Sequence, residues 1–402
     1  MISPCREGTS LEPADSRETG MTIDLRDAME ERALLVQASI GQRTKADAEA
    51  ALEELRRLSD TAGARVVGSV TQRIRRPTPD HFIGKGKLAE VRLAAEHTRA
   101  NLIIFDNELS PAQVNNLDLA LGVKVIDRTE LILQIFARRA RSAESKIQVE
   151  LAQLQYLVTR IPVSVKQHRF TGGIGMKGPG ETPFQLRAAP MRQRIAESRR
   201  KLEEIGERRQ RTRGHRHQQM VSLVGYTNAG KSTLLNALSA AGTYVDDRLF
   251  ATLDTKTSTV YLPDARKVLL TDTVGFIRDL PHSLVASFRS TLDEVNESSL
   301  MLIVVDVSHP SVADHFRVVI ETLEDIGAVT VPAIVVLNKS DCPARYPIPP
   351  EMLAPCPDRV EISALREQGL DELKALIAAR LPPPPVRRPA PNWRDWPASE
   401  QS

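Results

Sequence analysis

The sequence predicts an α/β protein built from an N-terminal α/β domain, an antiparallel helical hairpin and a second domain with a mostly parallel sheet. Apolar runs of strand length alternate with helical periods in residues 29–128 and again in residues 216–382. Between these regions, apolar residues recur every three or four positions along two successive segments. A chain of 402 residues is long enough for domains of these sizes, each with its own core.

Residues 29–128 are expected to form a parallel sheet with helices between its strands. The strand candidates are RALLVQASI, ARVVGSV, NLIIFDN and VKVID, and the helix candidates include DAEAALEELRRLSDTAG and KLAEVRLAAEHTRA. Residues 1–28 contain turn-forming residues, mixed charges and no apolar period, which favours a disordered leader.

Two heptad-spaced helices are expected within residues 129–215. Their seam positions are Ile147, Leu151, Leu154, Val158 and Ile161 in the first helix and Met191, Ile195, Ser198, Leu202 and Ile205 in the second. Successive helices with such seams should pack against each other as an antiparallel hairpin. Because proline is favoured in the first turn of a helix, the second helix should begin near Pro190.

The connection between these helices, residues 162–186, is rich in glycine and in basic side chains. Lys166, Arg169 and Lys177 are therefore candidates for contact with RNA, and a plain linker is the alternative. Residues 192–216 hold ten Lys or Arg against four Glu. This excess suits a polyanionic partner, or alternatively a solvated helix face.

The second α/β region, residues 216–382, contains six strand candidates. They are MVSLVGY, TVYLP, KVLLTD, LMLIVVDV, PAIVVLN and RVEIS, and the helix LDELKALIAARL follows them. Residues 383–402 are rich in proline and favour a disordered tail.

Several other features narrow the class of protein. The longest apolar runs have strand length, far short of the ~20 residues of a membrane span, and no secretory apolar core is present near Met1. A cytoplasmic protein is therefore expected. Three cysteines, Cys5, Cys342 and Cys356, lie far apart, which favours free thiols. A pair of histidines in RGHRH, His215 and His217, has no further ligands nearby, which favours a basic linker over a metal site.

The segment GYTNAGKS, residues 225–232, follows a strand and precedes the helical STLLNALSA, which is the context of a phosphate-binding loop. In such a loop, backbone N–H groups from Asn228 to Ser232 surround the β-phosphate at the positive end of the helix. Lys231 can then reach the β- and γ-phosphates, and the Ser232 hydroxyl can bind Mg²⁺.

Four downstream motifs complete a GTP site in a Ras-like G domain. Thr252 in FATLD is the candidate switch threonine, Asp272 ends the strand KVLLTD, and the Gly275 N–H can sense the γ-phosphate. In NKSD, the Asp341 carboxylate can accept two hydrogen bonds from guanine that adenine lacks, a difference worth ~10⁴ in discrimination. The motif SAL follows the last strand, so one ligand is expected at the carboxyl edge of the sheet.

The expected roles divide into three sets. The residues expected to contact GTP are Gly225, Tyr226, Thr227, Asn228, Ala229, Gly230, Lys231, Ser232, Thr233, Phe250, Ala251, Thr252, Asp272, Thr273, Val274, Gly275, Asn338, Lys339, Ser340, Asp341, Ser363, Ala364 and Leu365. The expected catalytic set is Asn228, Lys231, Thr252 and Gly275. The expected Mg²⁺ ligands are Ser232, Thr252 and, through water, Asp272.

Phe276 follows DTVG at the position where many GTPases carry a glutamine that orients the attacking water. A phenyl ring cannot orient water, so slow basal turnover and stimulation by a partner are expected. Asn228 suggests that K⁺ assists hydrolysis, because asparagine at this point of the loop accompanies K⁺ dependence in several GTPases that lack the glutamine. The alternative is that Asn228 only shapes the loop.

The motifs together resemble the HflX family of GTPases. The resemblance is carried by GYTNAGKST, LFATLD, DTVGFIRDLP and NKSD, preceded by IGKGKLAEV, NELSPAQVNNL, VIDRTELILQIFARRARSAESKIQVELAQLQY and GGIGMKGPGET. It implies binding to the large ribosomal subunit and its RNA, with the N-terminal domain and the hairpin reaching toward the peptidyl-transferase region. It also implies ribosome-stimulated hydrolysis, a hydrophobic residue in place of the glutamine, and splitting or rescue of stalled ribosomes under stress.

The resemblance also carries one further implication and one departure. ATP binding is ascribed to the N-terminal domain of the family, and GKGK at residues 84–87 could serve it, although a glycine turn before a helix is favoured. After GPGET the family usually continues QLETDRR, whereas this chain has PFQLRAAPMRQRI with Pro183 and Pro190. This departure puts in doubt how rigidly the hairpin tip is held.

Three functional classes stay open on the sequence alone. The leading one is a monomeric, GTP-driven factor that binds ribosomes. The second is an assembly or regulatory GTPase that binds immature subunits or a protein. The third is a nucleotide-gated RNA-binding scaffold with little hydrolysis.

Overall fold

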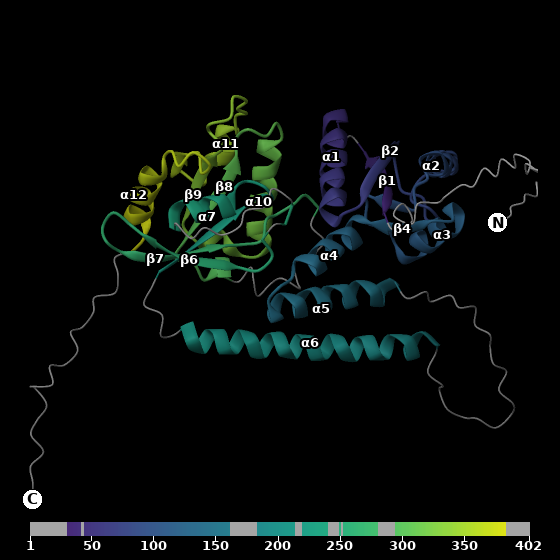
Figure 1. Ribbon diagram of the computed structural model, residues 1–402, viewed down its shortest axis with the longest axis horizontal. Helices are drawn as coiled ribbons and strands as arrows, with labels where there is room; N and C mark the ends of the chain where they lie inside the picture. The colour runs from purple at the N-terminus through teal and green to yellow at the C-terminus, as the bar shows by residue number, and fades with distance from the viewer. Residues whose placement is uncertain are drawn as a thin grey trace, which may run out of the picture.

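The computed structural model describes residues 30–41, 44–160, 183–213, 219–239, 249–250, 252–279 and 294–382. The predicted leader, the predicted tail and the RNA-contact candidates Lys166, Arg169 and Lys177 lie outside these ranges, as do Cys5, His215 and His217. Within them, the chain forms two α/β domains that lie side by side, with two long helices below both (Figure 1). The predicted α/β fold class is confirmed.

The N-terminal domain contains a four-stranded, fully parallel sheet in the order β2-β1-β3-β4. Its strands are β1 (Arg32–Ile40), β2 (Arg65–Ile74), β3 (Leu102–Phe105) and β4 (Lys124–Asp127), and its helices are α1 (Lys45–Ala62), α2 (Lys85–Thr98) and α3 (Pro111–Leu121). Alternate residues of β1 face opposite sides, so Leu35 packs on the α1 side and Leu34 on the α2 and α3 side.

Local hydrogen bonds set the ends of these helices. Thr44 accepts a hydrogen bond from the Asp47 N–H at 3.2 Å, and the Asp47 carboxylate accepts one from the Thr44 N–H at 3.0 Å. This capping box begins α1, and Gly63, with φ of 84°, ends it. Ser110 and Gln113 form the same box at α3.

Helix α4 (Arg128–Arg139) follows β4 directly and was not singled out by the sequence pattern. Asp127, which is fully buried, caps it by accepting a hydrogen bond from the Glu130 N–H at 2.9 Å. The apolar face of α4 packs on α1 and reaches toward the second domain.

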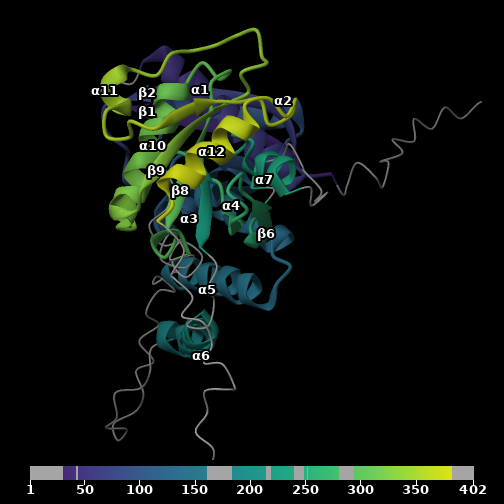
Figure 2. The ribbon, with the colours of Figure 1, turned by 90° about the vertical axis from the view of Figure 1, so that its left-hand side faces the viewer.

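The helical hairpin consists of α5 (Ala143–Arg160) and α6 (Pro183–Arg213). The two helices run antiparallel, side by side, with α6 on the outer side (Figures 1 and 2). Leu151 and Ser198 are buried and their seam neighbours are half-buried, as the heptads predict; Ile161 lies outside the described residues.

The predicted start of the second helix near Pro190 is wrong, because α6 begins at Pro183 and Pro190 lies inside it. Pro183 takes the first position, where a missing N–H breaks no intrahelical bond. Pro190 removes one such bond, but its ring is exposed while the neighbouring Ala188 is fully buried. Packing of this turn therefore keeps it helical despite the proline.

The second domain contains a six-stranded sheet in the order β10-β9-β8-β5-β7-β6, in which only β6 runs antiparallel to its neighbour. The strands are β5 (Met220–Gly225), β6 (Lys256–Tyr261), β7 (Lys267–Asp272), β8 (Leu300–Asp306), β9 (Ala333–Asn338) and β10 (Arg359–Glu361). The helices are α7 (Lys231–Ser239), α10 (Val312–Asp325), α11 (Pro350–Leu353) and α12 (Leu370–Arg380), with a 3₁₀ turn at Ala328–Thr330.

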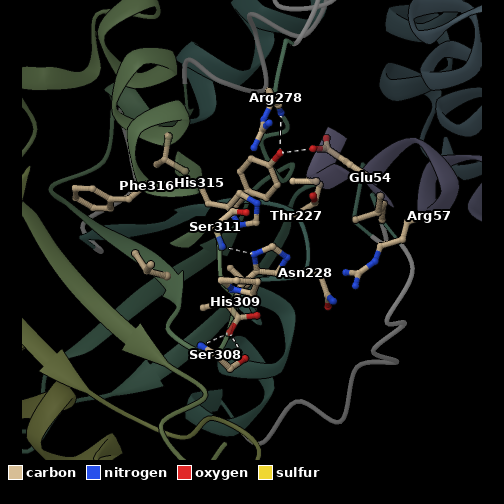
Figure 3. Close-up of a pocket in the computed structure, with 18 of the residues that line it drawn as sticks. Glu54, Arg57, Thr227, Asn228, Arg278, Ser308, His309, Ser311, His315 and Phe316 are labelled. Carbon is tan, nitrogen blue, oxygen red and sulfur yellow. Dashed lines mark hydrogen bonds between the residues drawn. The ribbon is translucent and has the colours of Figure 1, made fainter. Parts of the chain in front are cut away.

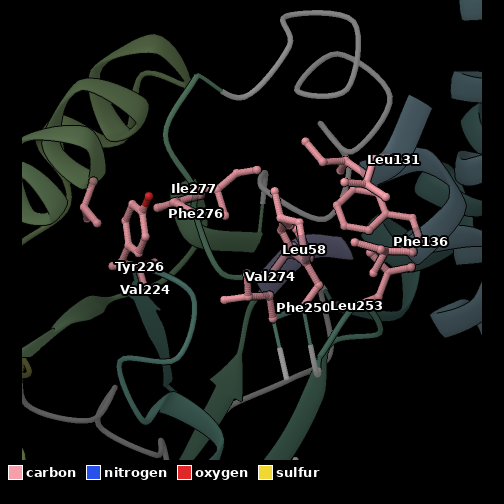
Figure 4. Close-up of a cluster of buried hydrophobic side chains, with 14 of the residues drawn as sticks. Leu58, Leu131, Phe136, Val224, Tyr226, Phe250, Leu253, Val274, Phe276 and Ile277 are labelled. Atoms are coloured by element: carbon pink, nitrogen blue, oxygen red, sulfur yellow. The ribbon is translucent and has the colours of Figure 1, made fainter. Parts of the chain in front are cut away.

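One apolar cluster continues from the N-terminal domain into the second domain. Phe136 of α4 meets Phe250 edge-on, with ring centroids 4.7 Å apart and planes at 85°. Leu58, Leu131 and Leu253 extend the same cluster across the boundary (Figure 4). The two domains therefore share buried surface next to the predicted switch segment.

Three absences hold for the part of the chain that the structure describes. No helix there combines the length and apolar character that crossing a bilayer requires. No group of three or more His, Cys, Asp or Glu side chains in those ranges is placed to hold a metal ion. Cys342 and Cys356 form no disulfide.

Candidate nucleotide-binding site

The phosphate-loop segment, residues 225–231, connects β5 to α7 along a tightly enclosed path. Gly225 has φ of 152°, and a Cβ there would lie 2.3 Å from the carbonyl oxygen of Val304. Gly230 has φ of 94°, and its Cβ would lie 2.3 Å from Nδ2 of Asn338. Only glycine fits at these two positions, which explains the spacing of the motif.

Lys231 opens α7 and its ammonium group folds back over the loop. Nζ donates to the carbonyl oxygens of Gly225 at 3.0 Å and of Tyr226 at 2.9 Å. Burial lowers the pKa of Lys231 to about 8, an effect that the carboxylate of Asp272 partly offsets.

Ser232, Thr252 and Asp272 come together although 40 residues separate the first from the last. The Ser232 hydroxyl donates to Oδ2 of Asp272 at 2.6 Å and the Thr252 hydroxyl donates to the same oxygen at 3.0 Å. Burial raises the pKa of Asp272, and within the described residues its Oδ1 is buried without a hydrogen-bond partner. Two hydroxyls and a carboxylate with a spare oxygen fit the hard-oxygen ligands that Mg²⁺ prefers.

The DTVGF segment lies directly on the phosphate loop. A Cβ at Gly275 would be 2.9 Å from Cα of Thr227 and 3.0 Å from Nζ of Lys231, so glycine is required at this contact. The Phe276 N–H donates to the Gly225 carbonyl at 3.1 Å, and the Phe276 carbonyl accepts from the Thr227 N–H at 2.8 Å. The Phe276 side chain is 2% exposed and belongs to the apolar cluster (Figure 4).

Asn338 of the NKSD motif joins two loops at the same edge of the sheet. Its Nδ2 donates to the Ala229 carbonyl at 2.8 Å, and its Oδ1 accepts from the Ala364 N–H at 3.0 Å. The following residue, Lys339, has φ of 64° and its Nζ lies 2.6 Å from Oδ2 of Asp306. The phosphate loop, NKSD and SAL are thus held together by one buried amide.

Asp341 lies beside these loops with a mostly buried side chain. The Ser363 hydroxyl lowers its pKa, and Arg366, whose Nε lies 3.5 Å from Oδ2, lowers it further. Leu365, by contrast, is 79% exposed. Asp341 is therefore a carboxylate poised to accept hydrogen bonds, in the position that the sequence assigned to guanine.

The structure brings most of the predicted site residues to the carboxyl edge of the second sheet, and Ala251 lies outside the described residues. The sequence analysis did not predict Asp306, whose carboxylate pairs with Lys339. Its position at the carboxyl end of strand β8, beside the strand of the phosphate loop, could have indicated it. The sequence also did not predict Glu54 and Arg128, for which no signal exists because they come from the other domain.

The GKGK segment, residues 84–87, begins helix α2. Gly84 is the N-cap residue, and Nζ of Lys87 lies 2.7 Å from Oε2 of Glu90 on the next turn. The segment thus has the form of a glycine turn before a helix, the interpretation that the sequence favoured.

A pocket of about 420 Å³ lies beside the phosphate loop, between the two domains. Glu54 and Arg57 of α1 line it from one side and Asn228 and His309 from the other (Figure 3). His315 stacks on Tyr226 with ring centroids 3.8 Å apart, and burial, followed by the charge of His309, lowers the pKa of His315 to about 3. These histidines are neutral at physiological pH, because burial lowers the pKa of His309 as well.

A glycine-walled phosphate loop, an oxygen ligand set and an NKSD motif on one sheet edge define a P-loop GTPase. Family comparisons agree along the chain. Residues 49–137 match the family described as GTP-binding GTPase N-terminal, residues 139–216 the GTP-binding GTPase Middle Region, and residues 220–339 the 50S ribosome-binding GTPase family. The chain belongs to the HflX family of GTPases.

Two relatives illustrate the similarity. GTPase HflX of Caldanaerobacter subterraneus subsp. tengcongensis is 47% identical over 337 residues, covering 83% of this chain and 77% of the relative. GTPase HflX of Escherichia coli (strain K12) is 41% identical over 335 residues, covering 82% and 79%. The solved structure of a GTP-binding protein from Sulfolobus solfataricus in complex with GDP overlaps loosely, with a TM-score of 0.46, 24% identity, and coverage of 87% of this chain and 98% of that one.

Proposed function

We propose that this GTPase is a cytoplasmic, monomeric factor that binds the large ribosomal subunit and dissociates or rescues stalled ribosomes. The observation that carries the proposal is the match of residues 220–339 to the 50S ribosome-binding GTPase family. The basic helix α6, on the outer side of the hairpin, supports it, because a net positive surface attracts ribosomal RNA.

In this proposal the nucleotide lies across the phosphate loop. Backbone N–H groups from Asn228 to Ser232 bind the β-phosphate, and Lys231 binds the β- and γ-phosphates. Ser232, Thr252 and, through water, Asp272 would hold Mg²⁺, which would supply positive charge against the phosphates. The buried Oδ1 of Asp272 and the 2.6 Å contact of its Oδ2 with Ser232 support this assignment.

Hydrolysis then depends on charge neutralisation and on an oriented water molecule. The phenyl ring of Phe276 carries no polar group, and it is buried in the apolar cluster. We therefore expect slow basal turnover that the ribosome stimulates. Asn228, which is exposed at the crest of the loop with φ of 61°, is the candidate ligand for an assisting K⁺ ion. Equal turnover rates in K⁺ and Na⁺ would reject the role of K⁺.

Co-sedimentation with purified ribosomes tests the proposal. With a non-hydrolysable GTP analogue, the chain should sediment with mature large subunits, and with GTP it should lower the proportion of intact ribosomes. The variant Lys231→Ala, which loses the phosphate-binding ammonium group, is the control and should do neither. Binding only to immature subunits would favour an assembly GTPase, and binding without single-turnover cleavage would favour a nucleotide-gated scaffold.

A further inference from the structure

The side chain of Tyr226 leaves the phosphate loop and reaches the N-terminal domain. Its hydroxyl donates to Oε2 of Glu54, on α1, at 2.8 Å and accepts a hydrogen bond from the backbone N–H of Arg278 at 2.9 Å (Figure 3). The side chain is 6% exposed. Burial, followed by the charge of Glu54, raises the pKa of Tyr226, so the hydroxyl keeps its proton and remains a donor.

Arg128, the first residue of α4, closes a ring of hydrogen bonds around Arg278. Its guanidinium donates to Oε1 of Glu54 at 2.5 Å, to Oδ1 of Asp106 at 2.8 Å and to the carbonyl oxygen of Arg278 at 3.0 Å. Arg128 is 5% exposed, so loss of either carboxylate would leave a buried charge poorly compensated. Both backbone polar groups of Arg278 are therefore bound by side chains from outside its own segment.

The ring of hydrogen bonds around Arg278 continues a contact with the phosphate loop that begins at Phe276. The Phe276 backbone is hydrogen-bonded to Gly225 and Thr227, so residues 276–278 lie along the start of the phosphate loop. Gly275 comes immediately before them. A Cβ built on Gly275 would lie 3.0 Å from Nζ of Lys231. A shift of residues 276–278 would therefore displace Gly275, which precedes them in the chain.

We propose that Glu54 and Arg128 of the N-terminal domain are positioning residues for GTP hydrolysis, acting through the Tyr226 hydroxyl and the Arg278 backbone. They hold the segment after DTVG on the phosphate loop and so orient the Gly275 N–H toward the γ-phosphate. A fixed backbone donor stabilises the charge of the transition state without reorganisation during the reaction. The inference rests on the proposed function, in which the phosphate loop is the hydrolytic site.

Tyr226→Phe and Glu54→Gln test the ring with little change in shape. Tyr226→Phe removes the hydroxyl and keeps the ring that stacks on His315, and Glu54→Gln removes the charge that pairs with Arg128. Each should slow single-turnover GTP cleavage without ribosomes by roughly 10- to 100-fold, the cost of a misplaced catalytic group. The affinity for a fluorescent GDP analogue should change by less than about threefold, because both variants leave Lys231 and the backbone N–H groups from Asn228 to Ser232 in place.

The control variant is Glu53→Gln, one residue earlier on α1. Its side chain is 55% exposed and pairs with Arg56 and Arg57 of the same helix, so cleavage should be unchanged. The double variant Tyr226→Phe with Glu54→Gln should be no slower than the slower single variant, because both remove one connection. Additive losses would contradict a shared ring.

Three other results would overturn the inference. The first two are unchanged cleavage and faster cleavage. The third is a slower rate accompanied by a weaker GDP affinity and a lower melting temperature, which would indicate a structural role. Lys231→Ala separates this inference from the proposed function. If Lys231→Ala retains GTP affinity, the proposed site is wrong; if it loses GTP while Tyr226→Phe cleaves normally, only the positioning ring is wrong.

Discussion

At the scale of the residue, we expect base selectivity to depend on one carboxylate, that of Asp341. The Asp341 side chain is oriented by Ser363 and Arg366, and its lowered pKa keeps it ionised at physiological pH. Asp341→Asn replaces one acceptor by a donor, which suits the second carbonyl of xanthine. We expect GTP affinity to fall by at least about 100-fold and that for xanthosine triphosphate to rise, because a mispaired buried polar group discriminates strongly.

Competition against a fluorescent GDP analogue measures this change. Asp325→Asn, an exposed position on α10, is the control and should leave both affinities unaltered. An unchanged preference for GTP in Asp341→Asn would mean that guanine is recognised elsewhere.

The protonation of Lys231 predicts a pH dependence of nucleotide binding. The pKa of Lys231 is about 8 because burial disfavours the ammonium form. Phosphate oxygens favour that form, so bound GTP should raise the pKa and binding should take up a proton above pH 8. Affinity should therefore be constant below about pH 7.5 and fall by up to about tenfold per pH unit above 8.

Titration calorimetry in two buffers with different ionisation enthalpies checks this linkage. At pH 8.5 the apparent binding enthalpies should differ, since GTP binding draws a proton from the buffer, and at pH 6.5 they should agree. Equal enthalpies at both pH values would show that Lys231 stays charged throughout.

At the scale of the element, the residues just before helix α5 are bound by a residue of the other domain. Ser142 itself caps the helix by accepting a hydrogen bond from the Ser145 N–H at 3.0 Å. Asp254, two residues after Thr252, accepts hydrogen bonds from the N–H groups of Arg141 at 3.0 Å and Ser142 at 3.3 Å. Burial alone would raise the pKa of Asp254, but hydrogen bonds from Ser142, Ser145 and the backbone lower it overall. Asp254 therefore joins the predicted switch segment to the start of the hairpin.

Asp254→Ala should lower the free energy of unfolding by about 1 kcal/mol, the usual net value of an intramolecular hydrogen bond. Because the folded-state pKa is lowered, this contribution is present above about pH 4 and is lost as the pH falls through the folded value. Hydrogen exchange of residues 141–146 should accelerate at pH 7. Asp325→Asn should change neither stability nor exchange, and equal protection in Asp254→Ala and the wild type would show that Asp254 does not stabilise the start of the hairpin.

The elements also show how far sequence reasoning reaches. Strands and the heptad hairpin were predicted because each depends on local apolar periods. Helix α4 was missed. The prediction from Pro190 was wrong because the sequence pattern does not show that Ala188, two residues earlier, is buried. The phosphate-loop motif specified its own site, whereas the hydrogen bond between Tyr226 and Glu54 joins residues 172 positions apart and leaves no local signal.

At the scale of the whole molecule, the two domains share an apolar core, with the ring of Phe136 against that of Phe250. Such a shared core couples the unfolding of the two domains, because neither can unfold without exposing the other's apolar side chains. It also places the boundary between domains next to Thr252. A movement of the segment around Thr252 would therefore affect its contacts with the N-terminal domain and the hairpin.

Phe136→Ala tests this coupling by calorimetry. The wild type should unfold in one transition, and the variant, destabilised by about 3–5 kcal/mol through the cavity it creates, should unfold in two. GDP should then raise the melting temperature of only one transition, that of the nucleotide-binding domain. Phe105→Ala is the matched control, because Phe105 is equally buried but packs in the cluster on the α2 and α3 side. Phe105→Ala should lower the melting temperature and still unfold in a single transition. Identical behaviour of the two variants would show that the Phe136 contact does not couple the unfolding of the two domains.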